Sequence, residues 1–211
     1  MRDNPIMTRR IRPIWIYLCL LLALTSCQWS AFLDDSNPPS IERLTLTEDV
    51  MFDFSDPETV SGWFTLNDDV MGGVSQSQIT QTSDGTAIFS GDISFENNGG
   101  FATIQANFRT SVDLSPYTGL QLRVRGDGKT YGIYLSDRPR SVVHQATFET
   151  VAGEWMTVNL PFSAFYPISF GRRVSANPLN PANLRSMSLI IEYKQSGSFA
   201  LEVASIGVYS D

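Results

Sequence analysis

Residues 120–128 read Leu-Gln-Leu-Arg-Val-Arg-Gly-Asp-Gly, and this stretch decides the fold class. Leu122 and Val124 alternate with polar residues, which places the apolar side chains on one face of a strand and both arginines on the other. Asp127-Gly128 then has the composition of a tight primed turn, because glycine supplies a positive φ. The stretch therefore predicts a half-buried strand that continues into a hairpin.

Runs of the same kind recur along the chain, with glycine or Asn/Asp turns between them. No helical period persists beyond about ten residues. Asn180 as a cap and Pro181 in the first position predict one short helical turn. Many short strands joined by turns predict an all-β fold, an antiparallel β-sandwich or jelly roll. The predicted strands are 50–54, 86–93, 101–108, 120–125, 131–135, 142–148, 155–160, 188–193 and 199–209.

The N-terminus differs from the rest of the chain. Three arginines between positions 9 and 12 precede an apolar run at 14–24, a pattern typical of a secretory signal peptide. The run is about half of the ~20 residues that a membrane-spanning helix needs. Leu24-Thr25-Ser26-Cys27 resembles the lipobox of bacterial lipoproteins, which implies a lipid on the Cys27 sulfur and cleavage just before it. We expect a signal peptide at 1–26, a lipidated cysteine and flexible tether at 27–47, and one domain at 48–211.

This leader changes the charge and the cysteine content of the mature protein. Removing residues 1–26 takes away four of 15 basic and one of 22 acidic residues, which leaves a formal charge of −10. Such a domain is repelled by nucleic acid and by anionic lipid headgroups. Cys19 lies in the leader and Cys27 would be lipidated, so no thiol is left for a disulfide, a metal site or a nucleophile. We expect a lipid-anchored protein on the extracytoplasmic face of a membrane, without a nucleic-acid partner.

The sequence carries no catalytic signature that we can identify, so we expect a protein that is not an enzyme and needs no cofactor. His144 is the one histidine and lies in a predicted strand, where a structural role is the commoner case. The neighbouring carboxyls of Asp68 and Asp69 face opposite ways on a strand, so they do not form a glycosidase pair. Together with Asn67 they could supply oxygen ligands to Ca²⁺, but no ligand ladder with fixed spacing supports this, and we predict no metal site.

Two segments, 63–75 and 91–102, are more unusual. The first contains Val-Met-Gly-Gly-Val-Ser and the second contains Asn-Asn-Gly-Gly-Phe. Glycine pairs allow tight turns and a close approach of the backbone. Met71 and Phe101 beside these turns would form a docking surface if exposed, but their spacing alone favours the core.

These segments resemble the family of complex I intermediate-associated proteins (the thirty-kilodalton assembly factor and its bacterial relatives). The family pattern is an aspartate-containing turn that runs into Val-Met-Gly-Gly-Val-Ser, here at 68–75, and a second motif that ends in Asn-Gly-Gly-Phe, here at 89–101. The resemblance covers roughly residues 50–209. Further matches lie at 122–128, 153–162 and 199–206, whereas the loop 169–173 reads Ser-Phe-Gly-Arg-Arg and departs from the family pattern.

The resemblance implies a galactose-binding-like jelly roll that assists the assembly or stability of a respiratory or photosynthetic membrane complex. Subunits of such a complex are the expected partners. The alternative is a carbohydrate-binding module on the extracytoplasmic side. Its candidate residues for stacking on a sugar are Trp63, Tyr131, Tyr134 and Trp155. We nevertheless expect each of these four side chains to lie in the core. The predicted binding residues are Asn67, Asp68, Asp69, Met71, Gly72, Gly73, Ser75, Asn98, Gly99, Gly100 and Phe101.

Overall fold

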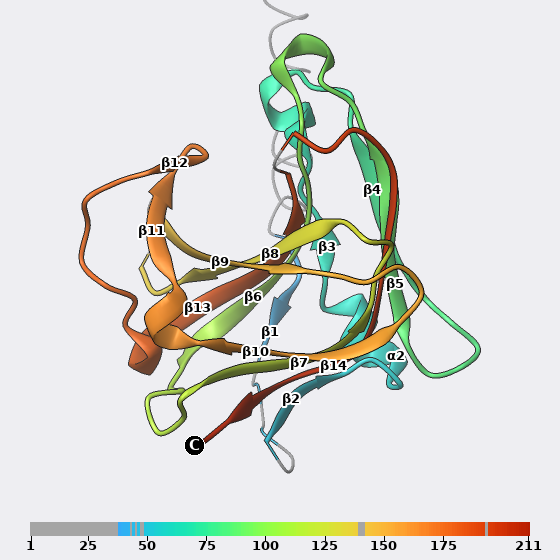
Figure 1. Ribbon diagram of the computed structural model, residues 1–211. Coiled ribbons are helices and arrows are strands. Elements are labelled where there is room, and N and C mark those ends of the chain that lie inside the picture. Colours follow the sequence, from blue (N-terminus) through green and yellow to red (C-terminus); the bar gives the residue numbers. More distant parts are fainter. Residues whose placement is uncertain (1–37, 43, 45, 47–48, 139–141, 193) are drawn as a thin grey trace, which may run out of the picture. The chain divides into compact units, whose positions relative to one another are not determined.

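Strands form where the sequence alternates, and they assemble into two sheets packed face to face (Figure 1). The computed structural model describes residues 38–211, apart from 43, 45, 47–48, 139–141 and 193. The predicted signal peptide and Cys27 lie outside these residues. Within the described part, no helix is long and apolar enough to cross a membrane.

The first sheet has eight strands in the order β1-β6-β13-β8-β9-β11-β12, and β3 pairs with β6 beside β1. The pair of β1 and β6 is parallel and the other pairs are antiparallel. The bounds are β1 Ser40–Ile41, β3 Phe64–Thr65, β6 Ala102–Val112, β8 Thr130–Ser136, β9 Val143–Glu149, β11 Tyr166–Ser169, β12 Arg172–Arg173 and β13 Leu184–Ile191.

The second sheet has six strands in the order β10-β7-β14-β5-β4, and β2 pairs with β14. All of its pairs are antiparallel. The bounds are β2 Val50–Asp53, β4 Gln76–Gln81, β5 Ala87–Ile93, β7 Gly119–Arg125, β10 Trp155–Pro161 and β14 Gly197–Tyr209.

Short helices join some of the strands. The predicted turn at Asn180 is confirmed, because the Asn180 side chain accepts a hydrogen bond from the Ala182 N–H (3.2 Å) at the start of η4. The bounds are α2 Pro57–Ser61, η1 Asp68–Met71, η2 Glu96–Asn98, η3 Phe162–Ala164 and η4 Pro181–Asn183.

The core lies between the two sheets and follows the period of two. Leu122 and Val124 are fully buried, as predicted, while Arg125 on the opposite face of β7 pairs with Glu202. Aromatic rings fill the middle, with the Phe89 and Phe199 centroids 4.9 Å apart. The predicted antiparallel β-sandwich is therefore the observed fold.

The predicted hairpin at Asp127-Gly128 is wrong. β7 and β8, which flank this turn, belong to different sheets, so the turn carries the chain from one sheet to the other. Gly128 does adopt a positive φ of 88°. The Asp127 carboxylate then accepts hydrogen bonds from the Tyr131 hydroxyl (2.9 Å) and the Lys129 ammonium (3.1 Å). These bonds stabilise a crossover whose local composition is the same as that of a hairpin.

Strand pairing begins earlier than the predicted domain start at residue 48. β1 pairs with β6 at Asn107 and Phe108, and Ile41, Leu44 and Leu46 pack against the core. Three apolar side chains within six residues explain the difference, because burying them against the core is favourable. The C-terminal part of the predicted tether, 27–47, is thus attached to the sandwich.

Candidate functional site

Asp68 connects the two glycine-rich segments and is 1% exposed. Its Oδ1 accepts a hydrogen bond from the Ser75 N–H (3.0 Å), and its Oδ2 accepts from the Ser75 hydroxyl (2.6 Å). Oδ2 also accepts from the backbone N–H groups of Gly100 (2.6 Å) and Phe101 (3.3 Å). Burial alone raises the pKa of Asp68, but these hydrogen bonds outweigh it and bring the pKa below its ordinary value. One ionised carboxylate therefore joins the turn that contains η1 to the turn that contains η2.

The glycine pairs exist because this carboxylate lies so close to the backbone. A Cβ atom at Gly73 would lie 2.3 Å from Asp68 Oδ1, and one at Gly99 would lie 2.5 Å from Oδ2. The other two glycines, Gly72 and Gly100, have positive φ values of 89° and 134°. Each glycine of the two motifs thus has a structural reason, either close approach or backbone conformation.

The Asp68-centred turns present apolar side chains to solvent. Val70 is 64% exposed and Met71 is 61% exposed, so the expectation of a core position for Met71 is wrong. Phe101 is half-buried. The reason is that η1 directs Asp68 inward, and the residues that follow it point away from the sandwich.

The remaining predicted binding residues divide into supporting and exposed ones. The Asn67 side-chain oxygen accepts from the Ser77 hydroxyl (2.6 Å) and the Thr103 N–H (3.3 Å), so it fixes the turn from the other side. Asp69 and Asn98 are exposed. The oxygens of Asp68 are engaged by N–H and O–H donors, which argues against a calcium ligand. Among the described residues, no group of three or more His, Cys, Asp or Glu side chains could hold a metal ion.

A groove runs over the outer face of the eight-stranded sheet, between these turns and the hairpin of β11 and β12. In Figure 1 the η1 and η2 turns and this hairpin rise on opposite sides of β8, β9 and β13. The groove has two overlapping parts, a polar end of about 480 Å³ and an apolar end of about 350 Å³. The polar end is lined by Gly99, Gly100, Phe101, Gln145, Tyr166, Ile168, Gly171, Arg173, Glu192 and Lys194.

Strand register places a row of side chains across the groove floor. Ser188 is paired with Gln105 on one side and Tyr134 on the other, and Gln145 lies between Tyr134 and Tyr166. The Ser188 hydroxyl donates to Gln105 Oε1 (3.1 Å). The floor therefore offers amides, hydroxyls and phenols in one line that crosses five strands.

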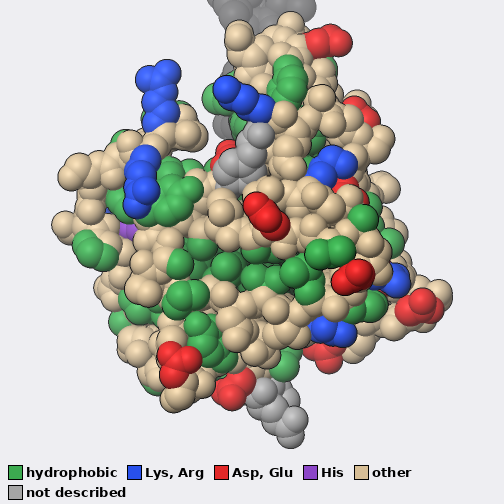
Figure 2. All heavy atoms as spheres, in the orientation of Figure 1, with side chains coloured by type: hydrophobic (Ala, Val, Ile, Leu, Met, Phe, Trp, Pro, Cys, Tyr) green, Lys and Arg blue, Asp and Glu red, His purple; other side chains and the backbone are tan. Residues whose placement is uncertain are grey.

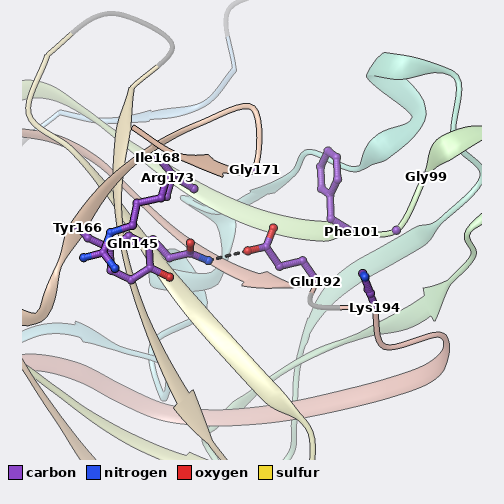
Figure 3. Close-up of a pocket in the computed structure, with 10 residues that line it drawn as sticks. Gly99, Phe101, Gln145, Tyr166, Ile168, Gly171, Arg173, Glu192 and Lys194 are labelled. Carbon is purple, nitrogen blue, oxygen red and sulfur yellow. Dashed lines mark hydrogen bonds between the residues drawn. The ribbon is translucent and has the colours of Figure 1, made fainter. Parts of the chain in front are cut away.

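Glu192 is held at the polar end by two of these side chains. The Tyr134 hydroxyl donates to Oε2 (2.9 Å). The Gln145 amide donates to Oε1 (2.5 Å), and Figure 3 draws this second bond. Burial, and then the negative charge of Glu192, raise the pKa of Tyr134 well above its ordinary value, so the phenol stays a hydrogen-bond donor.

The four aromatic candidates for sugar stacking do not come together. Trp63 and Tyr131 are core residues, as expected. Tyr134 lies on the outer face of the eight-stranded sheet, and Trp155 lies against Arg123 and Arg125 on the six-stranded sheet, so the expectation of a core position is wrong for these two. His144 is fully buried, and its Nε2 lies 3.0 Å from the Asn177 carbonyl oxygen, in agreement with a structural role.

Sequence reasoning missed Gln145, Tyr166, Arg173 and Glu192, which line the groove. They lie on β9, on the hairpin of β11 and β12, and just after β13, three segments that are separated in the chain. The available signal is the side-chain parity of β9 and β13, which puts Gln145 and Ser188 on the outer face once the core face is known. This parity does not show which strands are neighbours in the sheet, so it could not bring these side chains together.

A family profile described as complex I intermediate-associated protein 30 (CIA30) matches residues 52–203. The chain belongs to the CIA30 family. It is 27% identical over 187 residues to the mitochondrial CIA30 protein of Drosophila melanogaster, which covers 77% of this chain and 63% of that protein. The mouse protein is 26% identical over 184 residues, covering 77% and 56%. This CIA30 chain thus spans less than two thirds of the length of these relatives.

Solved structures show the fold that this CIA30 chain shares with binding modules. A family 11 carbohydrate-binding module of the Clostridium thermocellum cellulase Lic26A-Cel5E superposes with a TM-score of 0.59, at 13% identity, over 77% of this chain and 94% of the module. The agarase AgWH50C superposes with a TM-score of 0.55, at 12% identity, over 77% of this chain and 24% of the enzyme. At these identities the likeness concerns the sandwich alone.

Proposed function

We propose that this chain is a non-catalytic binding module that assists the assembly or stability of a membrane protein complex. Lipidated Cys27 would hold it on the extracytoplasmic side. Family membership supports this proposal, because the curated relatives are named for an intermediate of complex I. A lipid tether would raise the effective concentration of the module near membrane subunits without requiring any further contact.

One observation carries the proposal: the Asp68 carboxylate holds two turns rigidly while Val70 and Met71 face solvent. A buried hub with four hydrogen bonds maintains the backbone, so the exposed apolar side chains are presented in one arrangement. Gathered apolar side chains on the surface mark interaction sites more often than isolated ones do. Leu66, Val74, Phe95 and Phe170 are also exposed, and Leu66 and Phe170 line the apolar end of the groove with Met71.

The test is an affinity pull-down of the tagged full chain from lightly crosslinked, gently solubilised membranes, followed by mass spectrometry. We expect subunits of one membrane complex to be enriched with the native chain and lost with Val70→Asp and Met71→Asp. Val151→Asp is the matched control, because Val151 is 50% exposed and lies outside the groove. Equal recovery of the same subunits with all variants would contradict the proposed surface, and no enriched complex would contradict the proposed function.

A carbohydrate is the second candidate ligand, favoured by the row of hydroxyl, amide and phenol groups on the groove floor. A glycan array probed with the native chain and with Gln145→Ala tests it. Binding of a glycan that is lost in this variant would support the carbohydrate hypothesis, and an array without signal would exclude the glycans it carries.

A further inference from the structure

Two basic side chains face the polar end of the groove without a carboxylate partner. Arg173 and Lys194 line opposite sides of it, as Figure 3 shows. Among the described residues, no carboxylate oxygen lies within 4.0 Å of either group. Four other basic residues do have such partners, in the pairs Arg109–Glu42, Arg125–Glu202, Lys129–Asp127 and Arg138–Asp137. Arg123, Arg172 and Arg185 also have no such partner within the described part of the chain, but they do not line the groove. The polar end is therefore where two such cations face one cavity.

Arg173 is held in place by a ring instead of by an anion. Its guanidinium carbon lies 4.3 Å from the centroid of Tyr166, which is a cation–π contact. This contact uses none of the five guanidinium N–H donors, so the group is positioned and still able to bind a carboxylate in a bidentate manner. Glu192 does not compete, because Tyr134 and Gln145 donate to its two oxygens.

The apolar end of the groove begins directly beside these cations. Phe101, Ile168 and Gly171 line both ends, and Phe170 at the tip of the hairpin is 84% exposed. Figure 2 shows basic side chains (blue) on the hairpin of β11 and β12 with apolar atoms (green) beside them. The groove thus combines an end with two cations and the hydrogen-bonded carboxylate of Glu192 with an apolar end on one sheet face.

We propose that this groove binds an extended segment of the partner protein that carries a carboxylate next to a large apolar side chain. The inference rests on the proposed protein-binding function and names the chemistry of its ligand. The carboxylate lies between Arg173 and Lys194, and the apolar side chain packs against Met71 and Phe170. Residues two apart in an extended chain are about 7 Å apart on the same side, which spans neighbouring parts of one groove.

The same contacts disfavour a sugar at this end. A sugar ring stacks on a free aromatic face, but the Arg173 guanidinium covers a face of Tyr166. The two cations also favour a segment that carries a carboxylate over an uncharged sugar at this end.

The experiment is a selection of short random peptides displayed on phage against the immobilised full chain. We expect enriched sequences to share Asp or Glu one to three residues from a large apolar residue. The double variant Arg173→Gln/Lys194→Gln should select peptides without this acidic preference. Phe170→Ala should weaken an enriched synthetic peptide about tenfold, because burial of one large apolar side chain is lost. Arg185→Gln is the matched control, since Arg185 is exposed and lies outside the groove.

Enriched peptides without an acidic preference, equal affinity for the double variant and the native chain, or no enrichment would overturn the inference. If a glycan from the array displaced an enriched peptide, the groove would be a carbohydrate-binding site and the inference would be wrong. If the pull-down recovers a membrane complex while the peptide selection fails, the proposed function survives and only the ligand chemistry is wrong. If the pull-down fails while acidic peptides are selected, the groove chemistry stands and the assembly function is wrong.

Discussion

Replacing Asp68 with asparagine tests the hub that joins the two glycine-rich turns. The substitution keeps the shape of the side chain but turns one acceptor oxygen into an NH₂ group. In the better of its two orientations, the amide oxygen accepts the three bonds made by Oδ2 and the NH₂ group faces the Ser75 N–H. The Ser75 N–H and the new NH₂ group then face each other without an acceptor, and the other three bonds lose the negative charge of their acceptor.

The magnitude follows from these four bonds. An unsatisfied buried donor costs about 1–3 kcal/mol, and hydrogen bonds to charged groups are worth more than neutral ones. We therefore expect the free energy of unfolding of Asp68→Asn to be about 3 kcal/mol lower than that of the native chain. For a domain of this size, this corresponds to a midpoint temperature about 6–12 °C lower.

Thermal and urea unfolding, followed by circular dichroism, measure this difference. Asp69→Asn is the matched control, because Asp69 is exposed and accepts one bond, from the Val70 N–H (3.1 Å). We expect the control to change stability by less than about 0.5 kcal/mol. Equal midpoints for Asp68→Asn and Asp69→Asn would refute the idea that the buried carboxylate holds the two turns together.

Three further outcomes follow. Because the pKa of Asp68 is lowered on folding, its carboxylate should stabilise the native state fully above the ordinary carboxyl pKa of about 3.9. This contribution should be lost as the pH falls towards the folded pKa. Urea titrations below pH 5 should therefore show a weaker pH dependence of stability for Asp68→Asn than for the native chain. Gly73→Ala places a Cβ 2.3 Å from Asp68 Oδ1 and should lower the free energy of unfolding by about 1–3 kcal/mol, measured by urea unfolding; a native-like midpoint would argue against the close approach. Cys27→Ser should move the protein from the membrane to the soluble extracytoplasmic fraction; retention in salt-washed membranes would contradict the lipid anchor.

The strands were predictable because each one depends on local alternation. All nine predicted runs became strands, including β7, whose Leu122 and Val124 face the core. β4 was missed because its Gln-Ser-Gln-Ile-Thr-Gln sequence is polar, as an edge strand of the sandwich can be. β11 and β12 were missed because Pro167 and Gly171 resemble loop residues.

The motif turns were located from the sequence, but their roles were not. The pattern at 68–75 and at 89–101 identified the family, and the family profile confirms that resemblance. Spacing alone placed Met71 in the core, whereas it is 61% exposed. The burial of Asp68 required a contact with Gly100 across 32 residues, which no local pattern contains.

The sequence by itself determined the class of the fold, the positions of most strands and the family, because these depend on side chains a few residues apart. The tertiary structure decided which strands pair, and therefore that Asp127-Gly128 crosses between the sheets instead of closing a hairpin. It also decided that Tyr134, Gln145, Tyr166 and Glu192 share one groove. The physical reason is that pairing and burial are set by contacts between distant segments, whereas turn composition and alternation are satisfied equally well by several arrangements of the same strands.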